Sequence, residues 1–347
     1  MSRIASIFRE RIYKKLFRTK ILNDQFNKGY EEFLKTGKTS QEAYLAMINL
    51  YCKSNGKFTD ELHEKTSSAH PKIAKQNDIT GVLGKLDTKQ YSSINETLRK
   101  DGYVSFDKKL SSDIVKKLYE YALKTPALTA PKYDKKIVYD ENKPVSEIYR
   151  FDMQDLVNNP EIQDLIMDES LINIARNYLD SEPIFDFPAM WWSTCFLKEA
   201  SSEAAQLYHF DMDRIKWLKI FIYLNDVTMD NGPHSYIKGS HATGSKPQDL
   251  LSRGYVRIAD DELSKEYKKE DFITICAEAG SVFAGDTKCW HKGNPLKKGH
   301  RLALEFEYTT SMFGSQYPKF EIKQCSDAFK KFCSENKRYA SNFNFPK

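Results

Sequence analysis

A short polar motif, placed directly before a long apolar run, constrains this chain more than any other feature. The motif occupies residues 206–213, and the apolar run, a strand candidate, occupies 217–224. Within the motif His209 and Asp211 are two residues apart, so in an extended strand both side chains leave the same face. A neutral imidazole and a carboxylate on one face supply two of the three ligands of the 2-His-1-carboxylate triad that holds non-haem Fe(II). The motif therefore predicts a metal site carried by a strand.

The third ligand of such a triad is expected far down the chain. His291 is the candidate, and Arg301 follows it ten residues later at the start of another apolar strand candidate. Asp213 would share the face of Asp211, so spacing alone leaves it open as the carboxylate ligand. Four residues in this order are far more specific than any one of them: His209, Asp211, His291 and Arg301.

Alternation along residues 301–308 separates a charged face from an apolar one. Arg301 and Glu305 lie on one face. The other face carries Leu302, Leu304, Phe306 and Tyr308. The charged face suits the lining of a polar pocket. Upstream, Trp191 and Trp192 are adjacent, so they leave opposite faces of a strand, and the inward one either lines the pocket or fills the core.

A wider set of residues accompanies the four-part motif. It comprises Gln206, Asn231-Gly232-Pro233, Lys238-Gly239-Ser240-His241, Gly285-Asp286, Gly293 and Asn294. Together with the motif, these residues make the region from about 95 to 310 similar to the phytanoyl-CoA dioxygenase family of Fe(II)/2-oxoglutarate oxygenases. The run Asp101-Gly102-Tyr103-Val104, between two helix candidates, matches the beginning of that family's domain.

The resemblance implies that Fe(II) binds His209, Asp211 and His291, and that 2-oxoglutarate and O2 are consumed. It also implies that Arg301 holds the distal carboxylate of 2-oxoglutarate, because a planar guanidinium pairs with a carboxylate in a bidentate fork. Related halogenases replace the ligand carboxylate by a small residue, so the carboxylate of Asp211 favours hydroxylation.

Several further residues are weaker candidates. Gln206 is similar to a family position near the metal, which implies a contact with the cofactor or the substrate. Tyr223 is a candidate for a hydrogen bond to 2-oxoglutarate, with simple packing as its alternative. His234 and His241 lie in a turn-rich region, where structural roles are the commoner outcome for a histidine.

The rest of the pattern predicts the fold class. Short β-prone segments after residue 183 alternate with Gly, Asn and Pro turns, which indicates a jelly roll. We expect an all-β core with helices (α+β), a cupin-like double-stranded β-helix. The predicted divisions are a helical extension and linker at 1–92, the oxygenase domain at 93–315, and a tail with a helix at 316–347. Helices are expected over 2–34 and 39–55, with 57–92 as a loosely packed arm and 125–149 as a loop.

Composition excludes several classes of protein. The 347 residues, 40% hydrophobic and 13% aromatic, suffice for one large domain with an appendage or for two domains. A net charge of +5 gives no case for a nucleic-acid partner. The six cysteines have no Cys-x-x-Cys spacing, which favours reduced thiols in the cytoplasm. No apolar run is long enough for a signal peptide or a membrane span.

Residues 1–22 have a basic and amphipathic pattern. Apolar residues recur at helical spacing among Arg and Lys, and Glu10 is the single acid. Such a helix either lies on an anionic membrane surface, giving a peripheral location, or packs its apolar face on the domain.

The predicted reaction is hydroxylation of an unactivated C–H bond. The expected substrate is a sugar, a glycan or a lipid-linked molecule; the alternative is a soluble metabolite such as an amino acid, an acyl thioester or a phosphonate. Two other classes compete with the oxygenase: a jelly-roll binding protein without turnover, and a zinc hydrolase with the same three ligands. Arg301 has no role in the hydrolase.

Overall fold

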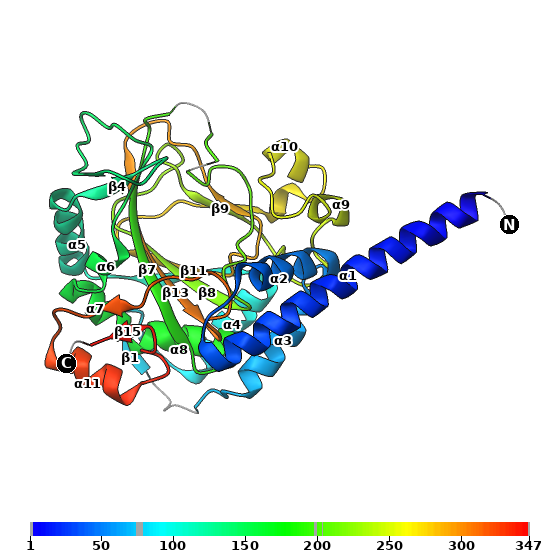
Figure 1. The fold of residues 1–347 in the computed structure, drawn as a ribbon. Helices are drawn as coiled ribbons and strands as arrows, with labels where there is room; N and C mark the ends of the chain where they lie inside the picture. Colours follow the sequence, from blue (N-terminus) through cyan, green and yellow to red (C-terminus); the bar gives the residue numbers. More distant parts are fainter. Residues whose placement is uncertain (1–2, 74–78, 198–199, 203, 346–347) are drawn as a thin grey trace.

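The predicted jelly roll is confirmed in the computed structural model, which describes residues 3–73, 79–197, 200–202 and 204–345, with side chains from residue 18 onward (Figure 1). The large sheet has eight antiparallel strands, in the order β3 (Tyr103–Lys109), β11 (Ser281–Gly285), β8 (Trp217–Tyr223), β13 (His300–Thr309), β7 (Ile184–Thr194), β6 (Ile148–Arg150), β4 (Ala127–Thr129) and β5 (Lys136–Ile137). The small sheet has three, in the order β10 (Phe272–Ile275), β9 (His234–Ile237) and β12 (His291–Gly293).

Helices and short strand pairs complete the described chain. The helices are α1 (Arg3–Thr36), α2 (Gln41–Ser54), α3 (Lys57–Ser68), α4 (Thr88–Asp101), α5 (Ser112–Lys124), α6 (Met153–Leu156), α7 (Pro160–Ile166), α8 (Glu169–Leu179), α9 (Gln248–Leu251), α10 (Asp260–Leu263) and α11 (Asp327–Glu335), with a 3-10 turn at Lys269–Asp271. The short pairs are β1 (Ile79–Gly81) with β2 (Gly84–Leu86), and β14 (Phe320–Glu321) with β15 (Phe343–Asn344).

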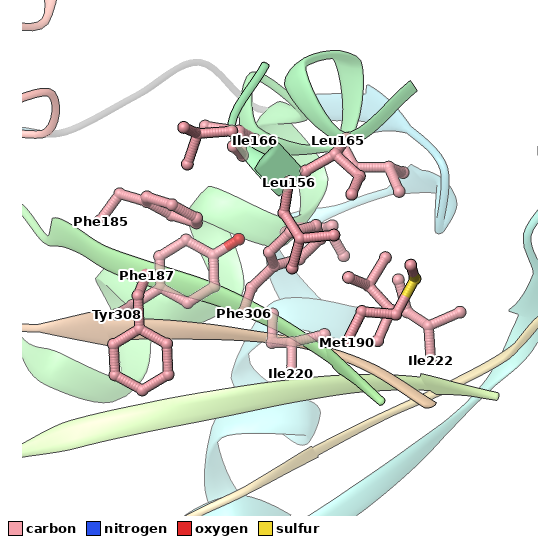
Figure 2. Packing of buried hydrophobic residues seen from close by; sticks show 14 of the residues in the cluster. Leu156, Leu165, Ile166, Phe185, Phe187, Met190, Ile220, Ile222, Phe306 and Tyr308 are labelled. Atoms are coloured by element: carbon pink, nitrogen blue, oxygen red, sulfur yellow. The ribbon is translucent and has the colours of Figure 1, made fainter. Parts of the chain in front are cut away.

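One face of the large sheet is apolar and covered by helices. Alternate residues of β7, β8 and β13 point to this side, as the period of two predicts. They pack against apolar residues of α4 to α8 and of α11 in one continuous core. Figure 2 shows Met190, Ile220, Ile222 and Phe306 from the strands, with Leu156 of α6 above them. This core fixes the positions of the three strands, and therefore of the side chains on their other face.

The opposite face of the large sheet is turned toward the small sheet. Phe221, Tyr223 and Ala303 form a smaller apolar cluster there with Tyr236 of β9. Arg301 and Glu305 lie on the same side and line a cavity between the elements. The predicted separation of a charged and an apolar face along β13 is confirmed.

The N-terminal helices share a core with the segment that carries the predicted motif. Met47 and Tyr51 of α2 belong to one buried cluster with Phe210, Trp217 and Trp290. The Tyr51 and Phe210 rings are 5.4 Å apart, centroid to centroid. The helices therefore buttress the segment that carries His209 and Asp211. This segment pairs through isolated bridges at Tyr208 and His209, so the strand predicted for it is wrong.

Two local predictions are wrong. The arm expected over 57–92 contains α3, β1, β2 and the start of α4, and Leu62 of α3 is buried in the helical core. The loop expected over 125–149 contains β4 and β5, which extend the large sheet. Their strands are only two or three residues long, too short to show a periodic pattern in the sequence.

The predicted helices over 2–34 and 39–55 are confirmed as α1 and α2. Ser40 caps α2, since its side chain accepts a hydrogen bond from the Ala43 N–H. The N-terminal part of α1 projects away from the rest of the chain in Figure 1. Most side chains of the basic segment 1–22 lie outside the described ones. In the part of the chain that the structure describes, no helix combines the length and the apolar character needed to cross a membrane.

Candidate active site

Three predicted ligands meet at the point where two distant segments pair. His209 and His291 form an antiparallel bridge, with backbone N–H to O distances of 3.0 and 2.8 Å. The Asp211 N–H donates to the Thr287 carbonyl at 2.8 Å, which fixes the third position. One ligand atom from each of His209, Asp211 and His291 lies within 4.8 Å of the others. Asp213 is not a member of this group, although it lines the same cavity.

Each imidazole is oriented by a carbonyl of its own segment. His209 Nδ1 lies 2.9 Å from the Leu207 oxygen, and His291 Nδ1 lies 3.0 Å from the Cys289 oxygen. A carbonyl only accepts, so both Nδ1 atoms carry the proton, and both Nε2 lone pairs are free for a metal. These Nε2 atoms lie 3.8 and 3.7 Å from the two oxygens of Asp211. Burial lowers the pKa of both histidines, which favours the neutral imidazole that binds metals.

Lys219 of β8 sits beneath Asp211 and is surrounded by carboxylates. Its Nζ lies 3.0 Å from Asp211, 3.3 Å from Glu305 and from Glu307, and 3.8 Å from Asp213. Burial acts to raise the pKa of Asp211, but the Lys219 ammonium and the two histidines outweigh it and lower that pKa. Asp211 is therefore held as a carboxylate, the form that binds a metal ion. Sequence reasoning missed Lys219, although a single charged residue inside the apolar run 217–224 was a visible signal.

A cavity of about 310 Å³ opens beside the three ligands. Its wall includes Arg301, Lys219 and Glu305 from the large sheet, with Trp191, Phe187 and Tyr317 as an aromatic side. Of the two adjacent tryptophans, Trp191 lines the cavity, and Trp192 is buried in the helix-covered core. His234 also lines the cavity, which is more than the sequence suggested for a histidine in a turn.

Arg301 is buried at the cavity wall, and one of its three nitrogens has no hydrogen-bond partner among the described residues. Its Nη1 donates to the Gly232 carbonyl, and its Nη2 donates to Ser193 Oγ at 3.0 Å. Its Nε has no hydrogen-bond partner among the described residues. A Cβ on Gly293 would lie 3.1 Å from Arg301 Nη2, so glycine at this position leaves room for the guanidinium. A buried guanidinium with a spare donor fits an anionic ligand.

The two weaker candidates lie behind the cavity wall. Gln206 is buried, and its side-chain oxygen accepts from the Ser201 N–H at 2.9 Å. The Tyr223 hydroxyl lies 3.0 Å from His234 Nδ1, accepts from the His234 N–H at 2.9 Å and donates to the Ile275 carbonyl. His241 lies elsewhere, against the Arg99 carbonyl and Cys289 Sγ. The roles predicted for Gln206 and Tyr223 toward the cosubstrate stay predictions.

A sequence profile of the phytanoyl-CoA dioxygenase (PhyH) family matches residues 98–301. The chain belongs to the phytanoyl-CoA dioxygenase family. That family consists of non-haem iron, 2-oxoglutarate-dependent oxygenases, and the His-Asp-His group described above fits iron. All three residues of the group, and Arg301, fall inside the matched region. No curated protein sequence matches the chain.

Several solved structures resemble the chain at low identity. AviO1 from Streptomyces viridochromogenes Tue57 is 18% identical over 67% of this chain and 100% of its own, with a TM-score of 0.44. HygX from Streptomyces hygroscopicus, with nickel and 2-oxoglutarate bound, is 17% identical over 71% of this chain and 94% of its own, with a TM-score of 0.47. EctD from S. alaskensis, with bound Fe, is 19% identical over 72% of this chain and 92% of its own, with a TM-score of 0.46.

Proposed function

We propose that this protein is an Fe(II)/2-oxoglutarate-dependent dioxygenase whose metal is held by His209, Asp211 and His291. The observation that carries the proposal is the convergence of three ligand atoms within 4.8 Å, with both Nδ1 atoms already engaged by carbonyls. Three ligands on one face leave the remaining positions of an octahedral ion open to cosubstrate and O2. When bound, the metal supplies oxidation of a C–H bond coupled to decarboxylation of 2-oxoglutarate.

The residues of this chain position the reactants. We propose that Arg301 holds the distal carboxylate of 2-oxoglutarate, supported by its burial and its unused Nε donor. Lys219 holds the Asp211 carboxylate at 3.0 Å and so keeps one ligand oriented. Tyr223 holds His234, which lines the cavity, and Gln206 ties the segment before His209 to Ser201.

The proposed substrate is a sugar, a glycan or a lipid-linked molecule. The support is the aromatic side of the cavity, Trp191, Phe187 and Tyr317, against which the C–H face of a sugar ring can pack. The alternative is a soluble metabolite, and the same cavity volume of about 310 Å³ accommodates one.

The test is succinate release by the full chain supplied with Fe(II), O2 and 2-oxoglutarate. Cell extract is divided into soluble metabolites and membrane glycolipids, and each fraction is added separately to wild type and to Asp211→Ala. We expect one fraction to stimulate wild type and neither to stimulate the variant. Folded, iron-loaded protein that forms no succinate with either fraction would contradict the oxygenase. Turnover by zinc-loaded protein without 2-oxoglutarate would favour the hydrolase.

A peripheral membrane location through residues 1–22 belongs to the lipid-linked version of this proposal. Its support is the basic and apolar pattern of that segment in the sequence. Sedimentation with anionic vesicles, with and without residues 1–22, tests it. Equal sedimentation of both proteins would end this part of the proposal.

A further inference from the structure

We infer that the substrate carries a phosphoryl group, which binds Arg150 and Arg257 at the cavity mouth. The inference rests on the proposed function, because it concerns the substrate of the same site. Both side chains line the cavity and both residues are exposed. Within the described parts of the chain, neither guanidinium forms an ion pair with a carboxylate, so both charges are available to a ligand.

Arg150 reaches the cavity from the large sheet. It lies opposite Trp191 in the pairing of β6 with β7, so the two side chains leave the same face, the one that lines the cavity. Its guanidinium lies over the Tyr133 ring at 5.5 Å, which limits where the group points without neutralising its charge.

Arg257 reaches the cavity from the other side. Its neighbour Ile258 forms an antiparallel bridge with Tyr208, with backbone N–H to O distances of 2.8 and 3.1 Å. That register places Arg257 opposite His209, so its side chain leaves on the same face as a proposed metal ligand. The two arginines therefore approach one cavity from two different parts of the jelly roll.

The carboxylates that line the cavity gather at Lys219 and not at the two arginines. Asp211, Asp213 and Glu305 all surround Lys219, at 3.0 to 3.8 Å from its Nζ. Arg301 is separately placed, buried against Gly232 and Ser193. Arg150 and Arg257 thus have no carboxylate within ion-pair distance among the described residues. A phosphate monoester carries about two negative charges near neutral pH, which match the two guanidinium groups. Guanidinium groups bind phosphate oxygens in bidentate fashion, whereas one carboxylate carries a single charge.

The experiment measures binding by calorimetry, without O2, to full-length protein loaded with Fe(II) and 2-oxoglutarate. The probes are glucose 1-phosphate, inorganic pyrophosphate, glucuronate and glucose. The variants are Arg150→Gln, Arg257→Gln and the double variant. Arg253→Gln is the matched control, because Arg253 lies in the same segment as Arg257, is exposed, and pairs with Glu262 instead of lining the cavity.

We expect glucose 1-phosphate and pyrophosphate to bind wild type at least about tenfold more tightly than glucose or glucuronate. The double variant should lose at least about tenfold in affinity for both phosphates, and each single variant a smaller factor. Added salt should weaken phosphate binding to wild type more than to the double variant. Arg253→Gln should bind as wild type does, and all variants should melt within a few degrees of it because the side chains are exposed.

Four outcomes would overturn the inference. Two concern wild type: glucose, or glucuronate, binds as tightly as glucose 1-phosphate does. In the third, the double variant binds the phosphates with wild-type affinity. In the fourth, the double variant loses 2-oxoglutarate binding, which would assign the arginines to the cosubstrate. Iron and 2-oxoglutarate binding are titrated separately in wild type. Their failure would count against the proposed function, while arginine-dependent phosphate binding in the same protein would leave the inference intact.

Discussion

Two buried cations only five residues apart in the chain have opposite surroundings. Arg214 is enclosed: its Nη2 lies 2.8 Å from Asp186 Oδ1, its Nε donates to the other oxygen, and its Nη1 donates to the Ser315 carbonyl. Neither member of this pair is accessible to solvent. Lys219 instead faces four carboxylates and lines a cavity. Charges balance around Arg214 and do not balance around Lys219.

The difference separates a structural ion pair from a site built for ligands. A bidentate, fully paired arginine leaves nothing for a ligand to bind. The carboxylates around Lys219 exceed its single charge, and both oxygens of Glu307 lack a hydrogen-bond donor among the described groups. Burial raises the pKa of Glu305 and of Glu307, which shows that both carboxylates are poorly solvated where they stand. An uncompensated cluster of this kind, at a cavity, marks where a bound cation belongs.

The largest expected contrast comes from removing one carboxylate from each centre. Asp211→Ala should weaken iron binding and change stability little. Loss of a residue that only hydrogen-bonds a metal ligand typically costs roughly 10- to 100-fold, and we expect loss of this ligand itself to reduce turnover by more than that. Asp186→Ala should cost about 3–5 kcal/mol of unfolding free energy because it leaves the buried Arg214 guanidinium without its carboxylate partner. Iron titration, succinate release and urea unfolding of both variants measure the contrast. Iron binding that survives in Asp211→Ala and is lost in Asp213→Ala would reassign the ligand.

The second contrast concerns the cation itself. Lys219→Met should cost about 3–5 kcal/mol near neutral pH, because it leaves buried carboxylates without their cation. Loss of the ammonium raises the pKa of all four carboxyls in the folded variant relative to folded wild type, so the folded variant binds more protons than folded wild type does. The deficit relative to wild type should therefore shrink as pH falls and grow as pH rises.

Urea unfolding at several pH values between 5 and 8 measures this dependence. Lys57→Met is the control, because the Lys57 side chain is 72% exposed and forms an i,i+4 ion pair with Glu61. This substitution should change stability by less than about 1 kcal/mol at every pH. A deficit in Lys219→Met that is independent of pH would show that the cluster does not titrate as a unit.

The third contrast tests whether Arg301 behaves as a ligand-binding cation, unlike Arg214. Arg301→Lys keeps the charge and removes the bidentate fork, so the affinity for 2-oxoglutarate should fall about 10- to 100-fold with the iron affinity unchanged. Calorimetry without O2 measures both. If affinity for the organic substrate falls and affinity for 2-oxoglutarate does not, Arg301 serves the substrate instead.

The sequence predicted the polar face of β13 because it depends on a period of two along a single strand. The same spacing argument made His209 and Asp211 candidate ligands, although their segment pairs through isolated bridges and is not one of the strands. It also predicted the jelly roll, from short strands between turns. It did not predict Lys219 or Arg257 at the site. The position of Lys219 among the carboxylates follows from the pairing of β8 with β13, which places it opposite Glu307. Arg257 becomes a wall residue only through the bridge between Ile258 and Tyr208.

The same limit explains the errors at 57–92 and 125–149. Strands β4 and β5 are two or three residues long and gain their stability from pairing with each other and with β6, not from a pattern of their own. Strands this short leave no periodic signal in either segment. The carbonyls of Leu207 and Cys289, which orient the two imidazoles, were equally unpredictable, because a backbone carbonyl is present in every residue and leaves no signal in the sequence.

The smallest contrast compares Tyr223 and Tyr236, two tyrosines of the smaller apolar cluster between the two sheets. Tyr223→Phe removes the hydroxyl that accepts the His234 N–H, and should cost about 1–2 kcal/mol of stability because a buried donor loses its partner. Tyr236→Phe should be nearly neutral, since the buried Tyr236 hydroxyl has no partner among the described residues.

If Tyr223 acts through His234, its loss should change the affinity for 2-oxoglutarate by about threefold or less, well below the effect of Arg301→Lys. Urea unfolding and calorimetry of both variants measure these effects. A loss of 2-oxoglutarate affinity equal to that of Arg301→Lys would instead place the Tyr223 hydroxyl on the cosubstrate, the role predicted from the sequence.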